Sequence, residues 1–209
     1  MQVKICGITR TEDAVAAVDA GADAIGLIFY SGSKRHVAPQ AAAEIISNVS
    51  PYTSVVGLFV NADAGYVSDV LSCCPLSQLQ FHGDESPEFC SSFDRPYVKS
   101  VPVSSTEKMS EIVVAHPNAR AYLFDTQVPG AHGGTGKTFD WRLMPQKNIG
   151  HRVLAGGLDA ENVAEAITIA CPDAVDVSSG VEVTPGEKDH DKMYRFISAV
   201  KRADEVVVK

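Results

Sequence analysis

The chain has 209 residues, of which 45% are hydrophobic and 21% charged, so it is long enough to bury one full core. Its formal net charge is −8, from 18 basic and 26 acidic residues. This balance excludes a nucleic-acid-binding protein, because no basic surface is available to neutralise a phosphate backbone. A small anionic ligand remains compatible with the charge, since a few local donors suffice to hold one phosphate group.

The first residues and the apolar runs argue against export and against membrane insertion. Gln2–Gly7 has the pattern of a strand, so we expect no signal peptide, and the longest apolar runs fall far short of the ~20 residues that a membrane span requires. Five cysteines form no CxxC pair and no metal-ligand spacing: Cys6, Cys73, Cys74, Cys90 and Cys171. An odd number of such thiols predicts a protein of the reducing cytoplasm without a metal site.

Short β-branched or apolar runs recur along the chain at roughly 20 to 30 residues, the length of one strand-plus-helix unit. They predict strands over Val3–Cys6, Ala24–Phe29, Val55–Val60, Ser77–Phe81, Tyr97–Val101, Ala121–Asp125, Val153–Ala155 and Ala174–Val177. Amphipathic stretches between and after them predict helices over Glu12–Ala20, Pro39–Asn48, Ala160–Ala170 and Asp191–Arg202.

Three local patterns refine the helices. Met193, Phe196, Ile197 and Val200 follow the i, i+3, i+4, i+7 spacing and predict one buried face of the last helix. Asp159 precedes its helix as the expected N-cap. Gly21 follows its helix as the expected C-terminal capping residue.

Eight strand-plus-helix units in a row permit an open doubly wound α/β sheet or a closed (β/α)8 TIM barrel. We favour the barrel, as a single domain over residues 1–209, because no linker divides the chain and no predicted strand has the features of a protected edge. Lys4 and Cys6 share one side of the first strand, and Asp176 and Ser178 share one side of the last. If both sets face inward, Lys4 and Asp176 form an ion pair where the barrel closes.

In a barrel, reactive groups gather where the strands end. Cys6 ends the first strand, and although a lone cysteine is usually a buried filler, this position makes it a candidate general base. Lys4 lies two residues earlier, and a nearby positive charge lowers the pKa of a thiol. Asp125 ends the sixth strand. A turn or capping role is the alternative, but a carboxyl group in apolar surroundings can serve as a general acid.

Two further polar residues lie at predicted strand ends. Arg35 belongs to the polar loop Ser31–His36, and it is either part of a solvated charge cluster or a fork for a ligand carboxylate. His82 follows the fourth strand and is expected to be a polar residue of the barrel mouth that contacts the ligand. No second ligand has a suitable spacing to His82, so we predict no metal.

Three loops combine glycine with small residues and are suited to an anion. They contain Gly134 and Gly136, Gly156 and Gly157, and Ser178, Ser179 and Gly180. The first of them, Gly133–Thr138, has the wrong spacing for a P-loop, since the first glycine of that motif would fall on Ala131. We interpret it as a glycine-rich lid over the barrel mouth.

Several longer motifs follow one another along the chain. They are Val3–Thr9, Gly57–Asn61, Gln80–Gly83, Leu123–Asp125, Gly133–Trp141, Leu154–Leu158, Asp176–Glu182, and Pro185-Gly186 with Lys188-Asp189. Each is weak alone, but together and over the whole chain they resemble the phosphoribosylanthranilate isomerase family of tryptophan biosynthesis. The resemblance implies a (β/α)8 barrel that catalyses an Amadori rearrangement of an N-glycoside without a cofactor.

The resemblance also implies individual roles. Asp125 would protonate the ribose ring oxygen, Cys6 would remove the C2′ proton, and Arg35 would bind the anthranilate carboxylate. The phosphate would lie among the glycine-rich loops, at Gly134, Gly157, Ser179 and Gly180 and their neighbours Gly136, Gly156 and Ser178. We expect a monomer or a weak homodimer, because the tail Val206–Val208 is the only obvious exposed apolar stretch.

Two alternatives stay open. The first is another phosphate-binding barrel isomerase, such as one acting on a histidine-pathway aminoaldose. That activity usually depends on a pair of aspartates at opposite barrel strands, and here the first of those positions is Cys6. A non-catalytic phosphosugar-binding protein is the other alternative, but binding alone requires neither an acid nor a base.

Overall fold

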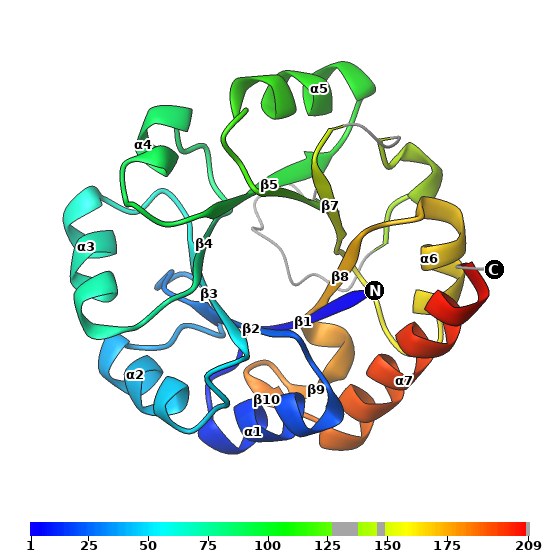
Figure 1. The fold of residues 1–209 in the computed structure, drawn as a ribbon, viewed down its shortest axis with the longest axis horizontal. Coiled ribbons are helices and arrows are strands. Elements are labelled where there is room, and N and C mark those ends of the chain that lie inside the picture. Colours follow the sequence, from blue (N-terminus) through cyan, green and yellow to red (C-terminus); the bar gives the residue numbers. More distant parts are fainter. Residues whose placement is uncertain (127–137, 146–148, 208–209) are drawn as a thin grey trace.

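A computed structural model describes residues 1–126, 138–145 and 149–207. Eight parallel strands close into a barrel in sequence order, and β8 pairs with β1 (Figure 1). The strands are β1 Gln2–Cys6, β2 Ala24–Ile28, β3 Ser54–Phe59, β4 Gln78–Phe81, β5 Tyr97–Val103, β6 Ala121–Thr126, β7 His151–Leu154 and β8 Ala174–Val177. All eight predicted strands are confirmed, with ends that differ by at most two residues.

Helices form a ring outside the strands (Figure 1). They are α1 Thr11–Ala20, α2 Pro39–Ser47, α3 Ala64–Cys73, α4 Pro87–Ser91, α5 Thr106–Ala115, α6 Val163–Ala170 and α7 His190–Val207. Within the described part of the connection from β6 to β7, the helical element is the short 3-10 helix η1 Trp141–Leu143. Between β8 and α7 the chain adds the 3-10 helix η2 Ser179–Val181 and a small hairpin, β9 Glu182–Thr184 and β10 Glu187–Lys188. The predicted (β/α)8 architecture is correct.

The core lies on both faces of the barrel wall. The predicted face of α7 is confirmed, because Met193, Phe196, Ile197 and Val200 are at most 1% exposed. Outward-facing residues of the strands pack against the helices in one large cluster that includes Phe59. A smaller apolar cluster fills part of the barrel, formed by Val98, Ala121, Leu123, Val153, Ala155 and Ala174. Burial on both faces explains why these strands appear as nearly continuous apolar runs.

One of the two predicted helix caps is correct. Gly21 follows α1 with φ of 101°, a left-handed conformation that favours glycine. Asp159 is not the N-cap of α6, which begins later, at Val163, after Asn162. Instead, the Asp159 carboxylate accepts hydrogen bonds from the backbone N–H groups of Glu161 and Asn162, and these bonds stabilise the turn before the helix. Aspartate side chains accept hydrogen bonds from backbone N–H groups in turns as well as at helix N-termini. The sequence pattern therefore did not distinguish a turn at Asp159 from the start of a helix.

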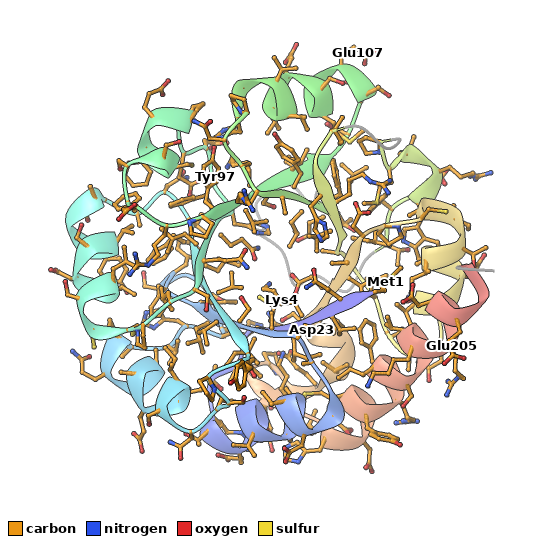
Figure 2. The ribbon with its side chains drawn as sticks, viewed as in Figure 1. Met1, Lys4, Asp23, Tyr97, Glu107 and Glu205 are labelled. Atoms are coloured by element: carbon orange, nitrogen blue, oxygen red, sulfur yellow. The ribbon has the colours of Figure 1, made fainter. Side chains whose placement is uncertain are left out.

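The predicted ion pair at the barrel closure is confirmed. Lys4 of β1 and Asp176 of β8 are register partners, and the Lys4 Nζ lies 2.9 Å from Asp176 Oδ1. Figure 2 shows Lys4 at the centre of the barrel, inside the ring of strands. Within the described ranges, no helix combines the length and the apolar character needed to cross a membrane.

A second buried carboxylate, that of Asp13, links α1 to β10 and α7 outside the barrel. Asp13 of α1 is fully buried and accepts from Arg10 Nε at 2.9 Å, from the backbone N–H of Lys188 at 3.0 Å and from His190 Nε2 at 3.0 Å. Burial opposes the charge of Asp13, yet the hydrogen bonds from Arg10 and Lys188 outweigh it and lower the pKa. The charged carboxylate is therefore part of what holds α1 against β10 and α7.

We expect Asp13→Asn to destabilise the fold at pH 7 by about 2 kcal/mol, the size of a hydrogen bond to a charged group. Because the folded-state pKa is lowered, the carboxylate stabilises the fold fully above its ordinary pKa of 3.8, and this stabilisation disappears as the pH falls through the folded value. Urea unfolding at pH 7 and pH 3 measures the effect. The deficit of Asp13→Asn should shrink at pH 3, and an equal deficit at both values would contradict the assigned charge.

Candidate active site

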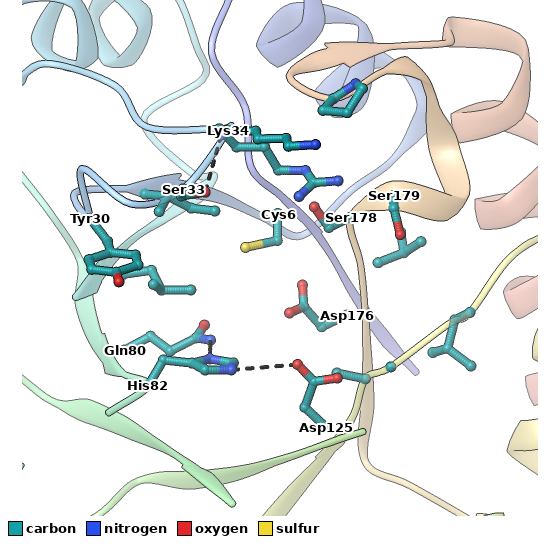
Figure 3. A pocket seen from close by; sticks show the side chains of 18 of the residues that line it. Cys6, Tyr30, Ser33, Lys34, Gln80, His82, Asp125, Asp176, Ser178 and Ser179 are labelled. Atoms are coloured by element: carbon teal, nitrogen blue, oxygen red, sulfur yellow. Dashed lines mark hydrogen bonds and ion pairs between the residues drawn. The ribbon is translucent and has the colours of Figure 1, made fainter. Parts of the chain in front are cut away.

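A cavity of about 460 Å³ opens where the strands of the barrel end. Eight of the residues predicted from the sequence line it: Cys6, Arg35, His82, Asp125, Gly156, Gly157, Ser178 and Ser179. They come from the ends of six different strands or the loops after them, because parallel strands bring all their carboxyl ends to one face. Figure 3 shows Cys6 and Asp125 on two sides of this pocket, with Asp176 between them in that view.

Three predicted residues stand apart from this group. Gly134 and Gly136, with the predicted lid, lie outside the described residues. Gly180 is not among the lining residues, and a methyl group at its position would lie 1.9 Å from the backbone oxygen of Leu158. Glycine at position 180 therefore lets the loop after β8 pack directly on the loop after β7.

Cys6 ends β1 and is 4% exposed. Burial raises the pKa of its thiol, and Asp176 raises it further, while Lys4 and Lys188 act in the opposite direction. Lys4 does lower the pKa of the Cys6 thiol, as expected. The net change is nevertheless an increase, so the expectation of a lowered pKa is wrong. A charged thiolate is costly where the thiol is buried, and the two nearby ammonium groups do not cancel that cost.

Asp125 is 8% exposed, and its two oxygens have different partners. Its Oδ1 accepts from the backbone N–H of Thr126 at 2.7 Å, and its Oδ2 lies 3.5 Å from His82 Nε2 (Figure 3). A methyl group on Gly156 would lie 2.9 Å from Asp125 Oδ1. Gly156 therefore lets the loop after β7 lie directly against the carboxyl group.

His82 contacts groups from three strands. Its Nδ1 lies 3.2 Å from the amide nitrogen of Gln80, and its Nε2 lies 3.3 Å from the hydroxyl of Ser100. In the tautomer in which Nδ1 accepts from the Gln80 amide, Nε2 carries the proton and faces Asp125. His82 is thus a neighbour of Asp125 as well as a mouth residue, and the contact with Asp125 was not predicted from the sequence.

Arg35 is buried rather than solvated, at 9% exposure. Its Nε and Nη2 donate to the two oxygens of Glu182 at 2.8 and 2.7 Å. Glu182 raises the pKa of Arg35, so the guanidinium stays charged. A methyl group on Gly7, whose φ is 75°, would lie 2.6 Å from Arg35 Cδ, so glycine makes room for this side chain. Glu182 therefore occupies the edge of the guanidinium formed by Nε and Nη2, and the remaining N–H groups could donate hydrogen bonds to a ligand.

Lys188 links three parts of the cavity wall. Its ammonium donates to the carbonyl oxygens of Cys6 at 2.7 Å and Ser178 at 3.1 Å, and to Glu182 Oε1 at 2.8 Å. Its side chain is fully buried. Sequence reasoning assigned no role to Lys188 or Glu182. The available signal was their position, since both charges follow the Ser178–Gly180 break within a few residues.

The loops after β7 and β8 form one side of the cavity. Gly156 and Gly157 have φ of 86° and 64°, left-handed conformations that favour glycine. Among the described residues, the buried Ser178 hydroxyl has no hydrogen-bond partner. A buried polar group without a partner is unfavourable unless a ligand or water supplies one. Within the same described ranges, no three His, Cys, Asp or Glu side chains cluster as metal ligands do.

Comparison with known proteins adds a family to this geometry. The family model described as N-(5'phosphoribosyl)anthranilate (PRA) isomerase matches residues 3–199. The N-(5'-phosphoribosyl)anthranilate isomerase of Acidithiobacillus ferrooxidans is 52% identical over 202 residues, covering 96% of this chain and 98% of the relative. The crystal structure of phosphoribosyl anthranilate isomerase from Thermotoga maritima superposes with a TM-score of 0.89 at 41% identity, covering 97% and 99% of the two chains.

A further crystal structure of that enzyme type was solved in complex with reduced 1-(o-carboxyphenylamino)-1-deoxyribulose 5-phosphate. It superposes with a TM-score of 0.86 at 40% identity and covers 97% of this chain and 99% of the other. Since the family model spans almost the whole sequence and these relatives match over nearly their full lengths, this chain belongs to the N-(5'-phosphoribosyl)anthranilate isomerase family.

Proposed function

We propose that this chain converts N-(5′-phosphoribosyl)anthranilate to 1-(2-carboxyphenylamino)-1-deoxyribulose 5-phosphate, an Amadori rearrangement of tryptophan biosynthesis. The observation that carries this proposal is a single cavity that holds a thiol, a carboxyl group, an arginine and two glycine-containing loops. The ligand of the related structure carries a carboxylate at one end and a phosphate at the other. The cavity offers matching groups for both ends and an acid–base pair for the sugar between them.

The first step assigns the general acid. Asp125 protonates the ribose ring oxygen, the bond from that oxygen to C1′ breaks, and the nitrogen lone pair forms the C1′=N bond of a protonated Schiff base. The location of Asp125 supports this role, because its Oδ2 is directed to the side of His82 while Thr126 holds the other oxygen. A positioned general acid typically contributes a factor of about 10²–10⁴ to the rate.

The second step assigns the general base. The Cys6 thiolate removes the proton from C2′, and the electron pair of that bond forms C1′=C2′ while the nitrogen becomes neutral. The resulting enolamine then loses its hydroxyl proton and gains a proton at C1′, which yields the ketone. Cys6 is placed for this role because it lies at the barrel mouth; burial raises the pKa of its thiol, and Lys4 and Lys188 act against that increase.

The two ends of the substrate have separate anchors. Arg35 binds the anthranilate carboxylate with the edges of its guanidinium that Glu182 leaves available. Backbone N–H groups of Gly156, Gly157 and Ser179 and the Ser178 hydroxyl bind the phosphate, as successive donors bind anions in other proteins. His82 contacts the sugar from the side of Asp125. Gly134 and Gly136 are expected to contribute to the same phosphate site, while Gly180 acts indirectly, by letting the loop after β8 pack on the loop after β7.

The five free cysteines support a reducing compartment, and we propose that the protein acts in the cytoplasm as a monomer or weak homodimer. No cofactor enters the reaction as written, because every proton is taken up or released by Asp125, Cys6 or the substrate itself.

The test is a turnover assay with N-(5′-phosphoribosyl)anthranilate, followed by the loss of its anthranilate-type fluorescence. We expect turnover by the parent chain. Binding of a phosphate-bearing product analogue without any turnover would instead support a non-catalytic phosphosugar-binding protein. Turnover of a histidine-pathway aminoaldose alone would contradict the assigned substrate.

A further inference from the structure

The ion pair between Lys4 and Asp176 lies inside the barrel, where charges are costly. The side chains of Lys4 and Asp176 are 11% and 8% exposed. Replacing such a buried pair by apolar residues often leaves stability unchanged or improves it, so the pair is weak evidence of a stabilising role. A function at the nearby site is therefore a better explanation than the fold for these two charges.

The pair lies directly beneath Cys6. Alternation along β1 puts Lys4 and Cys6 on the same side of the strand. A methyl group on Gly26 of β2 would lie 2.8 Å from Cys6 Sγ and 3.1 Å from Lys4 Cε, so both side chains pass over this glycine. Asp176 lines the cavity together with Cys6 (Figure 3). The ammonium, the carboxylate and the thiol thus occupy one small region of the barrel interior.

We propose that Lys4 and Asp176 are positioning residues that control the ionisation of Cys6 in opposite directions: the Lys4 ammonium supports the thiolate, and the Asp176 carboxylate opposes it. This inference rests on the proposed role of Cys6 as general base. The two residues have opposite direct effects on Cys6, because a positive neighbour favours the thiolate and a negative neighbour opposes it.

The charges around the thiol agree with this assignment. Burial opposes the charge of Lys4, but Asp176 and Cys6 outweigh it and raise the pKa of the ammonium, so Lys4 stays charged. The remaining groups that face Cys6 are Lys188, whose ammonium donates to the Cys6 carbonyl, and Arg35, which Glu182 neutralises. Lys188 is likewise paired with Glu182. Lys4 and Asp176 can therefore be altered without removing either partner of the Arg35–Glu182 pair.

The test measures the thiol itself rather than turnover. The exposed Cys73 and Cys171 are replaced by serine, and the rate of alkylation of Cys6 by iodoacetamide is followed against pH, with the modified peptide identified by mass spectrometry. Cys74 and Cys90 are buried, and burial is the largest cause of the raised pKa of each thiol, so both react slowly. In this background, Lys4→Met should move the midpoint of the rate profile up by at least about one pH unit, a tenfold loss of thiolate below the midpoint.

Asp176→Asn should move the same midpoint down, because it removes the negative neighbour. Lys4→Arg retains the charge and should leave the midpoint within about half a unit. If Lys4→Met does not fold, Lys4→Gln is measured in its place. An unchanged midpoint in the neutral Lys4 variant, or shifts of the two variants in the same direction, would overturn the proposal. Opposite shifts in a protein without isomerase activity would support this inference while contradicting the proposed function.

Discussion

Replacing Asp125 by asparagine is expected to lower kcat by about 10²–10⁴-fold, the typical contribution of a positioned general acid. An amide has nearly the same shape as the carboxyl group and can still accept from the Thr126 N–H, so the loop stays in place. It cannot deliver a proton to the ribose ring oxygen, and ring opening then depends on water. Single-turnover measurement of substrate fluorescence should show the loss in the chemical step rather than in substrate binding.

Cys6→Ala should cause a loss of similar size, because it removes the base of the second step. Asp84→Asn and Cys73→Ala are matched controls, since both residues are exposed and neither lines the cavity. Both controls should retain turnover within about twofold, as expected for surface substitutions. Parent-like turnover by Asp125→Asn or Cys6→Ala would exclude the corresponding role.

Lys188→Met is expected to destabilise the fold by about 3 kcal/mol and to lower kcat/KM as well. The substitution leaves the carbonyls of Cys6 and Ser178 without their buried donor and removes one of the two cationic partners of Glu182. Since Arg35 still pairs with Glu182, the expected loss is at the lower end of the range for a broken buried ion pair.

For a chain of about 200 residues, this loss corresponds to a fall in Tm of about 6–12 °C. Thermal denaturation followed by circular dichroism measures it. Lys108→Met is the matched control, because Lys108 is an exposed residue of α5, and it should change stability by less than about 0.5 kcal/mol. Equal Tm values for the two variants would contradict the structural role of Lys188.

The sequence predicted the eight strands and their closure because these depend on short-range patterns. Alternating and continuous apolar runs specify strands, and strand ends specify which side chains reach the barrel mouth. Cys6 and Asp125 could be identified as candidates for this reason, and so could the Lys4–Asp176 pair, whose partners occupy matching positions on the first and last strands. The start of α6 does not follow from the sequence in the same way, because a residue such as Asp159 suits a turn as well as a helix N-terminus.

The state of each charge could be decided only by the tertiary structure. From the sequence, Arg35 is either part of a solvated charge cluster or a fork for a ligand carboxylate, but the hairpin after β8 brings Glu182 onto it from 147 residues away. The same hairpin brings the Lys188 ammonium onto the carbonyl oxygen of Cys6, 182 residues earlier in the chain. The pKa of the Cys6 thiol depends on its burial and on the summed charges of such distant groups, and burial outweighs Lys4. Local patterns place a side chain on an element, whereas electrostatic energies depend on everything that surrounds it in space.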